Sequence, residues 1–194
     1  MESLAIIAEF NPFHTGHARL IRQVRQAAGP EAAIVIIMSG AFVQRGEPAF
    51  FDKWHRAAWA IDGGADVVIE LPAVYALSSA AGFAQGGVTL AARLGCQALA
   101  CGVEGGTAAD FLSLARRSEG LTACLKAAKK SSAGQQLTDA LMAAAPDEAR
   151  LLQQPNALLA FEYARAMLKQ EQPLTFLPLP RQGRHGDTGL GAAF

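Results

Sequence analysis

Short apolar runs alternate with helix-like segments through the first hundred residues. Runs at 4–8, 33–38, 67–71 and 97–101 predict strands, and 33–38 is apolar throughout, as in a strand covered on both faces. Between them, residues 16–28, 52–61 and 83–94 carry apolar side chains at helical spacing. Strands joined by helix-length crossovers predict an α/β fold, a Rossmann-like doubly wound parallel sheet with helices on both faces.

The pattern changes after Gly106. Residues 107–170 contain Ala-rich helical stretches, the last at about 156–169, and no convincing strand. Residues 174–179 predict a final strand, and a Gly-rich tail follows to Phe194 without a closing element. We therefore expect an α/β core at 1–106, a helical subdomain at 107–170, and a last strand with its tail at 171–194, in a chain truncated at its C-terminus.

Composition narrows the class of protein. The 194 residues are 51% hydrophobic, with 17 basic and 17 acidic side chains, which argues against a disordered chain and against coating of nucleic acid by bulk charge. No apolar run approaches the roughly 18 residues that span a bilayer, and the N-terminus lacks the basic lead of a signal peptide. Cys96, Cys101 and Cys124 share no metal-ligand spacing, so we expect reduced, mostly buried thiols in a cytoplasmic protein.

The strongest chemical signal is the run Glu9-Phe10-Asn11-Pro12-Phe13-His14-Thr15-Gly16-His17, at the junction of the first predicted strand and helix. Ligands of open parallel sheets bind beyond the carboxyl ends of the strands, and the first strand–helix turn favours phosphate. The helix N-terminus offers unpaired N–H groups, which Gly16 would let a phosphate approach. His14 and His17 can both face the mouth of this turn and donate hydrogen bonds to a triphosphate. The run therefore predicts that the core binds a nucleoside triphosphate for phosphoryl or nucleotidyl transfer.

Two other roles remain open for the two histidines. They have the spacing of half a zinc site, although no third ligand has an obvious position. They can also cap the helix and pack against Phe10 and Phe13.

The pattern Asn-Pro-Phe-His-x-Gly-His at 11–17 resembles the His-x-Gly-His signature of the nucleotidyltransferase superfamily. Segments at 38–48 (Met-Ser-Gly-Ala-Phe-Val-Gln-Arg-Gly-Glu-Pro), 52–54 (Asp-Lys-Trp), 65–72 (Ala-Asp-Val-Val-Ile-Glu-Leu-Pro) and 154–156 (Gln-Pro-Asn) resemble the bacterial tRNA(Met) cytidine acetate ligases, so the resemblance covers nearly the whole chain. It implies an ATP-dependent ligase that activates acetate to acetyl-AMP and acetylates the wobble cytidine of elongator tRNA(Met), giving acetylcytidine. It also implies that family members continue past this point, with a Ser/Thr-rich motif closing over the triphosphate and further tRNA-binding surface.

The resemblance also implies which residues bind ATP. His14 and His17 would lie at the phosphates and act in catalysis, and single contacts would come from Gly102, Asn156 and Arg181. We expect Mg²⁺ to be held through the phosphates and water rather than by protein ligands. The complete set of implied ATP-binding residues is Ile7, Ala8, Glu9, Phe10, Asn11, Pro12, Phe13, His14, Thr15, Gly16, His17, Ala18, Arg19, Leu20, Gly102, Asn156 and Arg181.

The residues themselves leave alternatives for the three single contacts. Gly102 ends the fourth predicted strand, next to the first, where a missing side chain would admit an adenine or ribose, but it also suits a plain turn. Asn156 follows Pro155 and suits a helix N-cap. Arg181, just past the last strand, can clamp phosphates or lie in solvent.

Other polar residues carry weaker hypotheses. The loop at 39–48 carries Gln44, Arg45 and Glu47 and is placed to close over an acceptor, while Lys53 and Arg56 can attract a carboxylate or simply be solvated. Glu9 and Glu70 end apolar strands and either orient a neighbour or face solvent. Basic clusters that could touch RNA, but more often form solvated faces, are Arg19, Arg22 and Arg25, then Arg116 and Arg117, then Lys126, Lys129 and Lys130.

Two further functions fit the same motif. One is an adenylyltransferase that acts on a small phosphorylated acceptor. The other is a nucleotide-binding fragment without chemistry.

Overall fold

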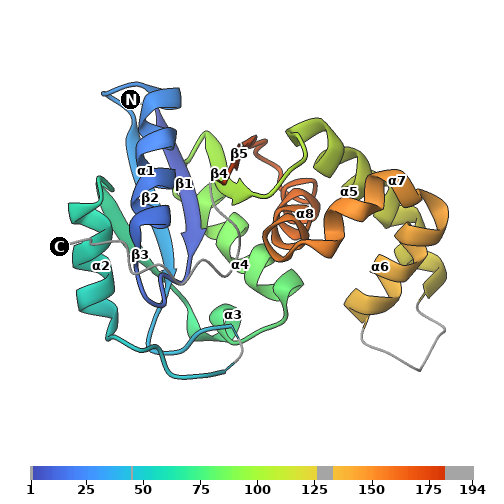
Figure 1. The fold of residues 1–194 in the computed structure, drawn as a ribbon, viewed down its shortest axis with the longest axis horizontal. Coiled ribbons are helices and arrows are strands. Elements are labelled where there is room, and N and C mark those ends of the chain that lie inside the picture. The colour runs from blue at the N-terminus through green and yellow to red at the C-terminus, as the bar shows by residue number, and fades with distance from the viewer. Residues whose placement is uncertain (1, 45, 126–132, 182–194) are drawn as a thin grey trace.

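The computed structural model describes residues 2–44, 46–125 and 133–181, with the side chains of 122–125 and 133 left aside. One parallel sheet of five strands, in the order β3-β2-β1-β4-β5, forms its centre (Figure 1). The strands are β1 (Ser3–Ala8), β2 (Ala33–Ser39), β3 (Val67–Leu71), β4 (Ala98–Val103) and β5 (Thr175–Pro180). This is the doubly wound sheet that the sequence predicts.

Helices connect the strands and cover both faces of the sheet (Figure 1). They are α1 (Thr15–Ala28), α2 (Lys53–Asp62), α3 (Ala73–Ala76), α4 (Ala80–Arg93), α5 (Ala108–Leu125), α6 (Ala133–Ala144), α7 (Pro146–Ala149) and α8 (Pro155–Met167), with a 3-10 turn at Arg150–Gln153. None of the helices in the described ranges is long and apolar enough to cross a membrane.

The central strand shows why the apolar runs are continuous. In β1, Leu4 and Ile6 belong to the hydrophobic cluster with α1 and α2, whereas Ala5 and Ile7 belong to the cluster with α4 and α8. Successive side chains of a strand point to opposite faces, so a strand covered on both sides must be apolar at every position.

Between β4 and β5, the described elements are all helical, as expected for 107–170. α8 packs against α4 and β4, and the Tyr163 hydroxyl lies 3.5 Å from the Ile7 carbonyl oxygen, so this helix covers the sheet directly. The division at 106 and 170 stays a prediction.

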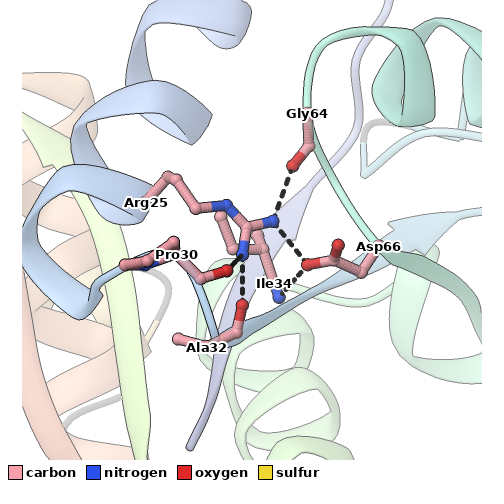
Figure 2. Close-up of polar contacts among 6 residues, drawn as sticks. All are labelled: Arg25, Pro30, Ala32, Ile34, Gly64 and Asp66. Atoms are coloured by element: carbon pink, nitrogen blue, oxygen red, sulfur yellow. Dashed lines mark hydrogen bonds and ion pairs between the residues drawn. The ribbon is translucent and has the colours of Figure 1, made fainter.

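A polar cluster joins α1 to the amino ends of the strands (Figure 2). Arg25 donates to Asp66 Oδ2 at 2.6 Å, to the Gly64 carbonyl at 3.1 Å and to the carbonyl of Ala32. The same Asp66 oxygen accepts the N–H of Ile34 at 2.7 Å. These bonds lie at the edge of the sheet opposite the predicted ligand site, so Arg25 has a structural role and is not available to the basic cluster proposed from the sequence.

Candidate active site: the cleft at the carboxyl ends of β1 and β4

A tight turn carries the chain from β1 into α1. Phe10 has a φ of 49°, in the left-handed region that a bulky side chain rarely adopts. This backbone buries the Phe10 ring beneath the start of α1, where it lies 5.0 Å from the ring of Phe13 and 4.7 Å from that of His17. The rings of Phe10 and Phe13 therefore pack against the His17 ring and support its position.

His14 and His17 form a reciprocal cap at the start of α1. The Gly16 N–H donates to Nδ1 of His14 at 3.1 Å, and the His14 N–H donates to Nδ1 of His17 at 3.2 Å. The two rings stack with centroids 3.6 Å apart. Such a capping box satisfies two backbone donors that the first turn of a helix otherwise leaves unpaired.

The electrostatics of the turn keep both imidazoles neutral. Burial, the neighbouring His14 and the charge of Arg181 lower the pKa of His17 to about 3. Burial and Arg181 also lower the pKa of His14. A neutral imidazole that accepts at Nδ1 carries its proton on Nε2. Each ring therefore has an Nε2–H donor left for an anionic ligand, so the cap and the ligand contact use different nitrogens.

A cleft of about 410 Å³ opens at this edge of the sheet and brings most of the predicted residues together. Gly102 of β4, Asn156 of α8 and Arg181 after β5 line it with the β1–α1 turn, although they are far apart in the sequence. From the continuous stretch, the lining residues are Ile7, Ala8, Glu9, Phe10, Asn11, Pro12, His14, Gly16, His17, Arg19 and Leu20. Phe13, Thr15 and Ala18 of the same stretch are not among the lining residues.

Glycine at two positions makes room for neighbouring side chains. A Cβ at Gly102 would lie 2.9 Å from Cγ of Arg181, so the missing side chain lets this arginine lie across the end of β4. A Cβ at Gly16 would lie 2.9 Å from Cε1 of His14, so the space predicted for a phosphate over Gly16 holds the capping imidazole.

Asn156 is not the N-cap of α8. That position belongs to Gln154, because Pro155 takes the first helical position, which suits a residue without an N–H. Glu104, just after β4, supplies the cap instead, since its carboxylate accepts the Ala157 N–H at 3.2 Å. The same carboxylate accepts from Nδ2 of Asn156, which fixes the amide at the rim of the cleft.

The loop between β2 and α2 is tied to the β1–α1 turn by two side chains. Oε1 of Glu9 accepts the Gln44 N–H at 2.6 Å, and Oδ1 of Asn11 accepts the Phe50 N–H at 2.7 Å. Glu9 therefore orients a neighbour, one of the two roles left open by the sequence. Among the described residues of this loop, Gln44 lines the cleft.

Arg56 is fully buried and holds the carboxyl ends of β1 and β2 together. Its guanidinium donates to backbone carbonyls of Glu9 at 2.6 Å, Phe51 at 3.0 Å, Ser39 at 3.1 Å and also Gly40. The sequence left two roles open for Arg56, which were solvation at the surface and attraction of a substrate carboxylate. The structure shows neither, because its guanidinium is buried and bonded to the backbone.

Several lining residues were not predicted: Ile6, Gln23, Phe83, Cys101, Leu159, Tyr163, Leu179 and Pro180. Most are apolar and belong to helical or strand patterns that indicate core packing. Burial raises the pKa values of the Cys101 thiol and the Tyr163 hydroxyl, so both groups are uncharged in these two lining residues.

Some of the remaining candidates have ordinary partners, and others lie outside the described residues. Lys53 pairs with Glu70 at 2.6 Å, and Arg117 pairs with Glu148 at 3.3 Å. No group of three or more His, Cys, Asp or Glu able to hold a metal ion occurs among the described residues. The candidates that lie outside the described part of the chain are Arg45, Lys126, Lys129, Lys130, the side chain of Cys124 and the tail from residue 182.

The sequence model of the HIGH nucleotidyl transferase family matches residues 1–190. The chain belongs to this family. Its curated relatives include the tRNA(Met) cytidine acetate ligases of Syntrophomonas wolfei, 42% identical over 94% of this chain and 46% of the relative, and of Pediococcus pentosaceus, 40% identical over 98% of this chain and 49% of the relative. The chain thus spans just under half the length of these relatives.

Two solved structures share the fold. Thermotoga maritima TmcAL, in a crystal structure bound with alpha-thio ATP, superposes with a TM-score of 0.84 and 32% identity, over 94% of this chain and 47% of that chain. The apo form of TmcAL superposes with a TM-score of 0.81 and 30% identity.

Proposed function

We propose that the cleft binds ATP and that the protein activates acetate as acetyl-AMP, then transfers the acetyl group to the wobble cytidine of elongator tRNA(Met). The observation that carries this proposal is the meeting of the His14–His17 turn with Gly102, Asn156 and Arg181 in one cleft of a HIGH nucleotidyl transferase. The similarity to TmcAL bound with alpha-thio ATP supports ATP as the nucleotide.

The residues of the cleft suit a triphosphate. Two neutral imidazoles with Nε2–H donors lie near one guanidinium, and charge builds on phosphate oxygens during nucleotidyl transfer. Arg181 supplies the positive charge and can bond two phosphate oxygens at once. The histidines donate without adding charge, and their rings are held in advance by the cap and by Phe10.

Mg²⁺ would neutralise part of the triphosphate charge, bound to phosphate oxygens and water. Acetate and tRNA enter the proposal through the relatives, whose name specifies a cytidine, an acetate and tRNA(Met). A tRNA substrate would make the cytoplasm the place of action.

The test is exchange of labelled pyrophosphate into ATP, with and without acetate. Reversible formation of acetyl-AMP predicts exchange that requires acetate. ATP binding without acetate-dependent exchange would refute the activation step. Exchange that requires a phosphorylated acceptor would instead identify the adenylyltransferase considered from the sequence.

A further inference from the structure

The loop between β2 and α2 carries a buried polar group without a partner on Gln44, which lines the cleft. Of the described side chains, three have a buried polar atom with no hydrogen-bond partner: Oγ of Ser39, Nε2 of Gln44 and Oε2 of Glu148. Two of these three lie near one another in the chain, Ser39 as the last residue of β2 and Gln44 in the loop that follows. Buried polar groups are nearly always paired, so an unpaired donor in the wall of a cleft points to an acceptor on a ligand.

Gln44 lies beside an acceptor of the protein. Its backbone N–H is bonded to Oε1 of Glu9, and both residues line the cleft. A carboxylate has two oxygens and accepts several hydrogen bonds, so Glu9 can accept another one from a ligand. Glu9 thus offers an acceptor and the Gln44 side chain a donor, on two residues that both line the cleft and are joined through the Gln44 backbone.

This pairing matches the edge of a cytosine base. Cytosine presents an amino donor at N4 next to an acceptor at N3, and carboxylates bond the N4 amino group well. Uracil reverses both groups, and a small carboxylate offers acceptors only, which the charge of Glu9 would repel. The amine that receives the acetyl group is this N4 group, so its base must reach the same cleft.

An exposed aromatic residue is attached through its backbone to a residue that lines the cleft. The backbone N–H of Phe50 is bonded to Asn11, which lines the cleft, while the Phe50 side chain is 80% exposed. Other exposed aromatic residues of this segment are Phe42, Phe51 and Trp54. Unpaired bases of RNA loops stack on such rings while their edges are read by polar groups.

We propose that Glu9 and Gln44 read the edge of the cytosine that accepts the acetyl group, and that Phe50 provides the surface on which this base or its neighbour stacks. This inference rests on the proposed function, from which it takes its substrate, the wobble cytidine of a tRNA. It adds the residues of the acceptor site, on the β2 side of the cleft, opposite the Gly102 and Arg181 side.

The first test is binding of RNA hairpins that carry cytidine or uridine at the wobble position, followed by fluorescence anisotropy. One well-placed pair of such bonds discriminates between bases by about 5- to 150-fold. The unsubstituted protein should therefore bind the cytidine hairpin at least about fivefold more tightly. Gln44→Met removes the donor at similar length and should abolish this preference, whereas Gln26→Met, an exposed position on α1, should retain it.

Phe50→Ala should weaken binding of both hairpins by about tenfold, the usual loss for one base–aromatic stack, while Leu94→Ala, another exposed apolar side chain, should not. An unchanged cytidine preference in Gln44→Met, or equal binding of both hairpins by the unsubstituted protein, overturns the proposal.

The second test separates this inference from the proposed function. In Gln44→Met, acetyl transfer to the RNA should fall by more than acetate-dependent pyrophosphate exchange does, because only the transfer step uses the base. A raised KM for acetate in the exchange reaction would assign Gln44 to the acyl substrate and overturn its role at the base. Absence of exchange in the unsubstituted protein refutes the proposed function, and the hairpin measurements still decide the base-reading role.

Discussion

The neutral state of His17 predicts how the stability of the protein depends on pH. In the folded protein the pKa of this imidazole is about 3, compared with about 6.5 in an unfolded chain. Between these values the unfolded chain binds a proton that the folded protein does not, so the free energy of unfolding falls as the pH drops. Stability from this source is complete above about pH 6.5 and is lost progressively below it.

The size of the effect follows from the two pKa values. At about pH 5 the imidazole is almost fully protonated in the unfolded chain and almost fully neutral in the fold, which costs up to about 2 kcal/mol of stability relative to about pH 7.5. His17→Asn removes the titrating ring, and its amide oxygen can still accept the His14 N–H. The variant should therefore lose less stability on acidification than the unsubstituted protein, by up to about 2 kcal/mol.

Urea unfolding at the two pH values measures this difference directly. His55→Gln, at an exposed position on α2, controls for the removal of an imidazole as such. If the unsubstituted protein and His17→Asn lose the same stability between about pH 7.5 and about pH 5, His17 is not held neutral by burial, and the assignment of its proton to Nε2 loses its basis.

Three other substitutions test parts of the cleft. Arg56→Met should lower the free energy of unfolding by about 3 kcal/mol or more, because it leaves four carbonyls without their donor; an unchanged melting temperature would contradict this. Gly102→Ala should displace Arg181 and weaken ATP binding in calorimetry by several-fold, whereas Gly120→Ala, with open space around it, should leave ATP binding unchanged. Glu104→Ala should destabilise the protein by about 1 kcal/mol through loss of the α8 cap, and an equal loss in Glu104→Gln would argue that the charge matters more than the bond.

The order of strands and helices could be predicted because both faces of the sheet are covered. The apolar run of β2 is continuous, and Gly29-Pro30 and Gly63-Gly64 end the helices beside it, so periodicity identified each element. The four-residue helix α3 was missed, since one turn is too short to show a period.

The site was only partly predictable, because several of its contacts join distant segments. The histidine turn is a local motif, and its sequence shows it. Arg56 looks like an ordinary polar position in an amphipathic helix, and its burial depends on carbonyls contributed by two other strand ends. Likewise, nothing local shows that Glu104 caps a helix more than 50 residues later, so the sequence could offer only Asn156 as a possible cap.

The position of β5 has a consequence for how the protein folds. This strand pairs only with β4 among the described strands, Ala98 lying beside Thr175, so the two partners are separated by the whole helical region. Pairings across such long stretches of chain form late and slowly. Arg181 follows β5 directly, so it can join the histidine turn only after this last pairing. A nucleotide that binds only the completed cleft would then stabilise the docking of β5, and its binding would report the final step of folding.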